Sequence, residues 1–128
     1  MQDCPFCKRL MSSEVLVSTD LSAAFLDGFP VSPGHCLIVP RRHVSSLFEM
    51  SDVEQHDLFS LLPVVRRLLD DRYHPAGYNI GMNIGEAAGQ TIGHAHLHLI
   101  PRYIGDVEDP RGGVRLIFPA SARYWELA

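Results

Sequence analysis

Three histidines alternate with apolar residues in the last third of the sequence: His94, His96 and His98. In an extended strand, residues two apart point to the same side, so the three imidazoles are predicted to share one face while the residues between them enter the core. A row of imidazoles suits nucleophilic or acid–base chemistry, and it also suits a three-histidine zinc centre. A solvated polar face is the non-functional alternative.

Small and polar residues directly before this strand favour anion chemistry. Asn83, Gly85, Gly89, Gln90 and Thr91 combine side-chain donors with glycines that let backbone N–H groups approach a ligand closely. A catalytic metal would instead need carboxylates that orient its histidines. The loop therefore favours a phosphate-bearing ligand beside the histidines.

The cysteines allow several interpretations. Cys4 and Cys7 form a Cys-x-x-Cys pair, which by itself fits a redox motif, half of a metal site or two free thiols, and no helix pattern typical of a redox protein follows it. Cys36 lies in an apolar run and is predicted to be a small core residue rather than a reactive thiol. An odd count of three cysteines, in a chain with no export signal, argues against a disulfide framework.

Length and charge exclude some classes of protein. The chain has 128 residues and is expected to form a single domain over residues 1–128. Its net charge is −4 and it has no long basic run, which argues against binding to a nucleic-acid backbone. No apolar stretch approaches the length of a membrane span, and the N-terminal residues lack a signal-peptide pattern. We expect a cytoplasmic protein with no membrane partner.

The elements that position the histidines follow from the periodicity of apolar residues. Ser51 and Glu54 form a capping box, and a leucine stripe after it predicts one long helix, which Pro63 is expected to kink or interrupt. One helix among strands indicates an α+β fold with a mostly antiparallel sheet. Residues from 105 onward are predicted to form an ordered tail that lies over other structure. Strands are predicted at residues 14–18, 23–27, 35–39, 78–84 and 94–100.

The histidine strand, taken with several blocks elsewhere, resembles the histidine triad (HIT) superfamily. His94-Ala95-His96-Leu97-His98-Leu99-Ile100 matches the signature in which three histidines alternate with hydrophobic residues. The resemblance spans residues 4–104 and is closest in pattern to prokaryotic diadenosine polyphosphate hydrolases and fragile-histidine-triad-like members. It implies a HIT-like fold with a sheet of about five strands and one main helix per subunit, the sheets being joined across a homodimer. The other matching blocks are Phe25-Leu26-Asp27 and residues 33–43, 83–85 and 88–91.

The resemblance also implies roles for individual residues. Neutral His96 would attack the α-phosphorus of a nucleotide and form a nucleotidyl-histidine, with a backbone carbonyl near His94 holding its other ring nitrogen. His98 would bind a phosphate oxygen and assist proton transfer, and His35 would support the cluster from a neighbouring strand. The residues implied to bind substrate are Leu26 beside the base, Asp27 at the ribose, and Asn83, Gly89, Gln90 and Thr91 at the phosphate oxygens.

A structural zinc is implied as well. Its ligands would be Cys4, Cys7, His43 and His94, a set that closes a tetrahedron without an open position. No organic cofactor is implied. Apolar residues off the main helix stripe, Phe59 and Val64, agree with a homodimer. Tyr124 and Trp125 in the tail are predicted to reach the site of the other subunit.

The implied function is hydrolysis or transfer at the α-phosphate of an adenosine or other purine nucleotide. Dinucleoside polyphosphates of the diadenosine tetraphosphate type are the favoured substrates. The alternatives are a purine nucleoside phosphoramidase or aminoacyl-adenylate hydrolase, a dinucleoside polyphosphate phosphorylase, a nucleotide-binding partner protein with weak catalysis, and a zinc hydrolase that uses all three histidines of the motif.

Overall fold

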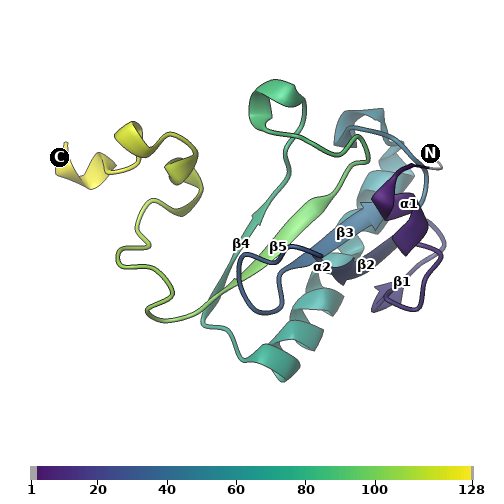
Figure 1. The fold of residues 1–128 in the computed structure, drawn as a ribbon, viewed down its shortest axis with the longest axis horizontal. Coiled ribbons are helices and arrows are strands. Elements are labelled where there is room, and N and C mark those ends of the chain that lie inside the picture. Colours follow the sequence, from purple (N-terminus) through teal and green to yellow (C-terminus); the bar gives the residue numbers. More distant parts are fainter. Residues whose placement is uncertain (1–2, 128) are drawn as a thin grey trace.

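The computed structural model describes residues 3–127, and its centre is a five-stranded sheet with the order β1-β2-β3-β5-β4, in which every neighbouring pair is antiparallel (Figure 1). The predicted α+β class, with about five strands and one main helix, is confirmed. The strands are β1 (Val17–Ser18), β2 (Ser22–Leu26), β3 (Cys36–Pro40), β4 (Gly77–Gly81) and β5 (Leu97–Arg102), and the α-helices are α1 (Pro5–Arg9) and α2 (Asp52–Tyr73). Short 3-10 turns lie at Leu47–Glu49, Glu86–Ala88, Gly113–Ile117, Pro119–Ser121 and Tyr124–Glu126.

The two faces of the sheet are covered by different helices. One face packs against α2, with Ile38 and Leu99 from the sheet meeting Leu58 and Val65 from the helix. The other face carries a smaller apolar cluster in which Phe6 of α1 packs with Phe25, Leu37 and Val39. Because side chains alternate along a strand, His98 lies on the same face as Leu37, its partner across β3 and β5. The histidines therefore belong to the face that α1 covers.

The long helix begins as predicted but is not interrupted. Ser51 Oγ accepts from the Glu54 amide at 3.1 Å and Glu54 Oε1 accepts from the Ser51 amide at 2.9 Å, so the capping box is confirmed. Arg42 donates to the same carboxylate at 2.8 Å, and this contact lowers the pKa of Glu54 to about 2. The predicted interruption at Pro63 does not occur, because α2 continues through this residue. Pro63 lies on the exposed side, while buried Leu61 and Val65 on either side hold the helix to the sheet.

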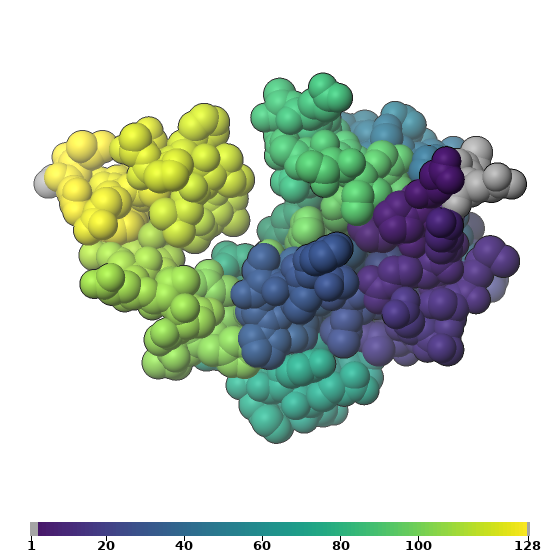
Figure 2. Space-filling view, in the orientation of Figure 1, coloured from purple at the N-terminus to yellow at the C-terminus, as the bar shows by residue number. Residues whose placement is uncertain are grey.

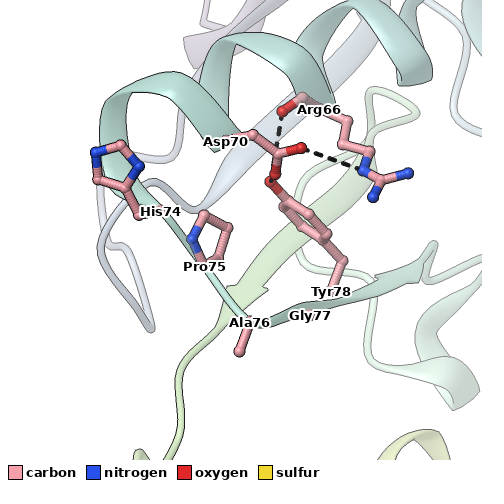
Figure 3. A pocket seen from close by; sticks show the side chains of 7 residues that line it. All are labelled: Arg66, Asp70, His74, Pro75, Ala76, Gly77 and Tyr78. Carbon is pink, nitrogen blue, oxygen red and sulfur yellow. Dashed lines mark hydrogen bonds and ion pairs between the residues drawn. The ribbon is translucent and has the colours of Figure 1, made fainter.

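The corner between α2 and β4 is tied by a polar contact. Tyr78 donates its hydroxyl proton to Asp70, and Asp70 also pairs with Arg66 at 3.4 Å (Figure 3). His74 ends the helix in the left-handed conformation at φ 53°. A cavity of about 370 Å³ opens at this corner. The last turns of α2, the connection and the start of β4 line this cavity, and none of the histidines at 94–98 does.

The C-terminal residues do not cover the sheet as predicted. Residues 103–127 run away from the body and fold into a separate lobe of short turns, with a gap beside the sheet (Figures 1 and 2). Inside the lobe, Arg111 lies 4.3 Å from the Trp125 ring and Arg115 lies 4.8 Å from the Tyr124 ring. A hollow of about 550 Å³ separates apolar tail residues such as Leu116 from Ile80 and Ile100 of the sheet. The tail therefore borders the sheet without filling that space.

Some predicted strand boundaries also shift. The first predicted strand shortens to Val17–Ser18, the predicted strand 78–84 ends at Gly81, and the histidine strand begins only at Leu97. Before Leu97 the backbone pairs instead with the loop after β3, where the Ala95 amide donates to the Val44 carbonyl at 2.7 Å. The helix α1 had no counterpart among the predictions. Within residues 3–127, no helix has both the length and the apolar character needed to cross a membrane.

Candidate active site

His96 has one ring nitrogen engaged and the other available. Its Nδ1 lies 2.8 Å from the backbone carbonyl oxygen of His94, so Nδ1 carries the proton and donates it. The opposite nitrogen, Nε2, then holds a lone pair, and it makes no hydrogen bond within residues 3–127. The side chain is 7% exposed and lines a cavity, so this lone pair is available to a ligand there. The predicted carbonyl partner of His96 is present.

A chain of hydrogen bonds determines the tautomer of His98. The Val31 amide donates to His35 Nδ1 at 3.1 Å, so the proton of neutral His35 lies on Nε2. That Nε2 lies 2.9 Å from His98 Nδ1, which must accept. The proton of His98 is therefore on Nε2. His98 also lines the cavity, so it presents a donor beside the acceptor of His96.

Burial keeps this histidine pair neutral. Burial, together with the neighbouring imidazoles of His96 and His35, lowers the pKa of His98 to about 4 against the opposing effect of Asp27. Burial also lowers the pKa of His35, while Asp27, whose Oδ2 lies 3.5 Å from His35 Nε2, acts in the opposite direction. At neutral pH both rings are uncharged and each offers one donor and one acceptor.

The cavity of about 390 Å³ above these rings gathers most of the predicted substrate-binding residues. Asp27, Asn83, Gly89 and Thr91 line it together with the three predicted catalytic histidines, His35, His96 and His98. The Asn83 side chain and the Thr91 hydroxyl make no hydrogen bond to any described residue. One carboxylate oxygen of Asp27 accepts a hydrogen bond from the Phe29 amide at 2.8 Å, which orients the carboxylate at the edge of the cavity.

Three predicted contacts differ. The Gln90 amide closes its own loop, donating to the Ser45 and Ile92 carbonyls at 2.8 and 3.0 Å and accepting from Gly85, so it is absent from the cavity lining. The Gly89 amide, predicted to hold a phosphate oxygen, donates to the Glu86 carbonyl at 2.9 Å instead. Gly89 sits at φ 93°, a conformation that favours glycine, which explains this residue without a ligand. Leu26 is half-buried and does not line the cavity.

One wall of the cavity comes from α1. Pro5, Phe6 and Arg9 line it, and the Phe6 ring centroid lies 4.9 Å from that of His96 in an edge-on arrangement. Phe6 also lies 5.6 Å from Phe25, so α1 rests directly on the face of the sheet that carries the histidines. These residues were not predicted. The sequence feature that could have indicated them is the three-residue spacing of Phe6 and Arg9, which places both side chains on the same side of a helix.

A second cluster is formed by the four side chains predicted to hold a metal, Cys4, Cys7, His43 and His94. Their ligand atoms lie within 4.8 Å of one another. His94 Nδ1 is 3.5 Å from each cysteine Sγ and 3.2 Å from His43 Nδ1, while Cys7 Sγ is 3.3 Å from His43 Nδ1. Tetrahedral zinc with bonds near 2.0 to 2.3 Å places its ligand atoms roughly 3.3 to 3.8 Å apart. The four side chains thus fit a tetrahedral ion.

The orientation of His94 agrees with such a site. Burial and the neighbouring Cys4 raise the pKa of the Cys7 thiol, so the pair favours neutral thiols unless a bound cation stabilises the thiolates. His94 donates from Nε2 to the Pro40 carbonyl at 2.7 Å, which leaves the Nδ1 lone pair directed at the cluster. His94 is therefore oriented for the cluster and not toward the rings of His96 and His98. This arrangement speaks against one metal held by all three histidines of the motif.

Comparison with known proteins identifies the family. A family model described as "HIT domain" matches residues 8–105. The chain belongs to the HIT family. Three curated relatives carry enzymatic names. A bis(5'-nucleosyl)-tetraphosphatase (asymmetrical) of Schizosaccharomyces pombe is 38% identical over 81% of this chain, an AP-4-A phosphorylase of Mycobacterium tuberculosis is 36% identical over 72%, and an adenosine 5'-monophosphoramidase of S. pombe is 36% identical over 77%.

The relatives differ in length from this HIT protein. It covers 57% of the tetraphosphatase and 48% of the phosphorylase, but 74% of the phosphoramidase. Among solved structures, a HIT family member from Bacillus subtilis is 34% identical with a TM-score of 0.74 over 81% of this chain and 76% of that one. A zinc-bound histidine triad family protein from Mycobacterium smegmatis is 26% identical with a TM-score of 0.74, and 99% of each chain is covered. The predicted family and fold are confirmed, and the named relatives support the prediction of an enzyme.

Proposed function

We propose that this HIT protein is a nucleotidyl hydrolase or transferase in which His96 Nε2 attacks the α-phosphorus of a nucleotide. The observation that carries the proposal is the hydrogen bond from His96 Nδ1 to the His94 carbonyl. It keeps the ring proton on Nδ1 and leaves the lone pair of Nε2 in the cavity, which is what an imidazole nucleophile needs. The carbonyl also stabilises the positive charge that the ring gains when Nε2 bonds to phosphorus.

The reaction takes two steps. In the first, a bond forms between Nε2 and phosphorus, and the bond from phosphorus to the leaving oxygen or nitrogen breaks with its electron pair. His98 Nε2–H lies next to this position and supplies a hydrogen bond to the phosphate oxygen or a proton to the leaving group. In the second, the oxygen of water or phosphate bonds to the phosphorus, and the bond from phosphorus to His96 Nε2 breaks with its electron pair returning to Nε2. The proton of an attacking water passes to His98 or to solvent, and His96 is restored as a neutral imidazole.

The remaining polar groups of the cavity hold the nucleotide. The uncommitted Asn83 amide and Thr91 hydroxyl donate to the phosphate oxygens, where charge develops in the transition state. The Asp27 carboxylate accepts from the ribose hydroxyls, as acidic residues do in other nucleotide sites. Phe6 and Ile92 supply apolar surface beside the histidines.

For the substrate we propose a dinucleoside polyphosphate of the diadenosine tetraphosphate type, cleaved by water. The tetraphosphatase relative supports this choice, and the phosphorylase relative supports phosphate as a competing acceptor. The phosphoramidase relative, of which this chain covers 74%, supports a second candidate, hydrolysis of a phosphorus–nitrogen bond. Both reactions use the same nucleophile.

We also propose that Cys4, Cys7, His43 and His94 hold a structural zinc. The fit of the four ligand atoms to a tetrahedron and the zinc-bound family member support it. When bound, the ion supplies a cross-link and no chemistry, because four protein ligands leave it no open position. The cross-link ties α1, which forms a wall of the cavity, to the segment that carries His96.

A homodimer is proposed on the basis of unpartnered apolar surface. β4 is the last strand of the sheet order, and its Ile80 is 47% exposed. Phe59 and Leu68 on α2 are 41% and 39% exposed. We expect sedimentation to give twice the chain mass, and Ile80→Lys to shift the protein toward monomer. Lys8→Ala, at an exposed position on α1, is the control and should leave the measured mass unchanged.

The test of the catalytic proposal is a turnover assay with wild type and His96→Ala. Diadenosine tetraphosphate and an adenosine phosphoramidate are compared, each with and without inorganic phosphate. We expect wild type to prefer the dinucleotide and His96→Ala to be inactive, and mass spectrometry of acid-quenched wild type to show one added nucleotide. A phosphate requirement would indicate a phosphorylase, and preference for the phosphoramidate would select the second candidate. Activity retained by His96→Ala on both substrates would disprove the proposed nucleophile.

A further inference from the structure

Arg9 lines the histidine cavity and takes no part in the chemistry proposed above. Among the residues that line this cavity, it is the side chain that carries a positive charge at every physiological pH. Its Nε donates to the Glu14 carboxylate at 2.9 Å, and its guanidinium carbon lies 4.2 Å from the centre of the Phe25 ring. The side chain is only 20% exposed.

The outer part of the guanidinium is held in place but unused. The terminal amino groups of Arg9 make no hydrogen bond to any residue within 3–127. Stacking on Phe25 and the bond to Glu14 restrict the motion of the group, so little freedom is lost when it binds. A planar pair of N–H donors held in this way is prepared for a planar ligand with two adjacent acceptors.

The sheet register shows which part of a nucleotide would reach Arg9. Phe25 and Asp27 are two residues apart on one face, roughly 7 Å along the strand. β3 separates β2 from β5, so the guanidinium over Phe25 lies about 10 Å, two strand spacings, from the strand that carries His98. Phe25 lies in the same row of the sheet as Leu37 and His98, and Asp27 follows two residues later. When the phosphate is at the histidines and the ribose at Asp27, the base is the part of the nucleotide left to contact the surface at Phe25 and Arg9.

We propose that Arg9 recognises the base of the nucleotide and favours guanine over adenine. This inference rests on the proposed function. Guanine presents O6 and N7 as two adjacent acceptors, which a guanidinium binds with two parallel hydrogen bonds. Adenine presents N7 beside an amino group, which is a donor and cannot accept a hydrogen bond from the arginine. Arg9 would therefore form two hydrogen bonds with guanine but one with adenine, and the second bond accounts for the preference.

The experiment compares guanosine and adenosine 5'-phosphoramidates, which share the leaving group and the reacting phosphorus. For wild type we expect kcat/KM to be about tenfold higher for the guanosine compound. Arg9→Leu retains an apolar stem over Phe25 but has no donors, and it should bring the ratio close to one by slowing the guanosine reaction alone. Arg9→Lys retains the charge without the planar pair and should also lose most of the preference. Lys8→Ala, which removes a charge from the exposed side of the same helix, should leave the ratio unchanged.

The outcomes separate this inference from the proposed function. An equal loss on both compounds in Arg9→Leu, or a wild type that prefers adenosine, would overturn the role of Arg9 in base recognition. If wild type turns over neither these compounds nor diadenosine tetraphosphate, the proposed function fails, and calorimetric titration with GMP and AMP decides the inference on its own. Tighter binding of GMP that disappears in Arg9→Leu would support it, and equal affinities would overturn it. Thermal melts show whether each variant is folded, and Arg9→Lys carries the test if Arg9→Leu is not.

Discussion

His94 and His96 are two residues apart in the same motif, yet the structure uses them in opposite ways. His94 is fully buried, and both of its ring nitrogens are engaged, one by the Pro40 carbonyl and one by the cysteine and histidine cluster. His96 has one engaged nitrogen and one lone pair in a cavity. Residue type and spacing are the same for both. The difference lies in the partners that surround each ring.

The comparison shows how the cysteine and histidine cluster supports the candidate nucleophile. The carbonyl of His94 accepts a hydrogen bond from the protonated nitrogen of His96, so a residue of the cluster also orients the proposed nucleophile. Phe6, located between the two cysteines in sequence, packs edge-on against His96 from the other side. Changes at His94 should therefore affect both stability and activity, whereas changes at His96 should affect activity.

The largest effect is expected for His96. His96→Ala should lower kcat/KM by about 10⁴-fold or more, because no other group in the cavity replaces the nucleophile. Its free energy of unfolding should change by only about 1 kcal/mol, since one hydrogen bond is lost beside a cavity. Steady-state kinetics and urea denaturation measure the two quantities. His56→Ala, at an exposed position on α2, is the control. A large loss of stability in His96→Ala would show that His96, like His94, is needed for the fold, and would contradict the contrast between the two residues.

A smaller effect on activity is expected for His98. His98→Ala removes the donor next to the reacting phosphorus and should lower kcat by roughly 10² to 10³-fold, the usual cost of one transition-state donor. His98→Gln keeps an N–H group and should recover part of this loss. Equal rates for the two variants would show that the donor at this position contributes little.

His94→Ala should act mainly on stability. The substitution removes the hydrogen bond to the Pro40 carbonyl and one of the four candidate metal ligands. We therefore expect the free energy of unfolding to fall by about 3 kcal/mol or more. Zinc content, measured by plasma emission spectroscopy, should fall from one ion per chain to none. Chelation of wild type should lower the melting temperature in the same direction. A chelated protein with an unchanged melting temperature would argue against a structural metal.

Acid should weaken the fold through His98 and His35. The pKa of His98 falls from 6.5 to about 4 on folding, so between these pH values the unfolded chain binds a proton that the folded chain does not. The free energy of unfolding should be constant above pH 6.5, fall as the pH drops from 6.5 to 4, and level off below. Urea denaturation at pH 7.5, 6 and 5 measures this slope. His98→Gln should reduce it, leaving the part due to His35. An unchanged slope would contradict the assignment.

The smallest change in stability is expected from the tail. Truncation after Ala122 removes Tyr124, which is 55% exposed, and should change the free energy of unfolding by about 0.5 kcal/mol or less. If the tail reaches the site of a partner subunit, the same truncation will alter the ranking of substrates. A ranking identical to that of the full chain would rule out that role.

Much of the candidate site was predictable because its signals are local. The alternating histidines, the carbonyl partner of His96, the capping box and the grouping of the four candidate metal ligands all depend on strand or helix periodicity or on a recognisable motif. The roles of Gln90 and Gly89 were not predictable in the same way. Both are polar or small residues in the correct loop, but their hydrogen bonds go to Ser45, Ile92 and Glu86, and a one-dimensional pattern does not show which partner competes best.

The sequence alone determined which residues can react and which face of the sheet carries them, because alternation follows from the geometry of a strand. Only the tertiary structure decided how each histidine is used, because the tautomer of a ring depends on partners that are distant in the chain, such as Val31 for His35 and Pro40 for His94. The same holds for α1. Its short apolar stretch predicts little by itself, and its position over Phe25 and His96 arises from packing and from the cluster that ties Cys4 and Cys7 to the sheet.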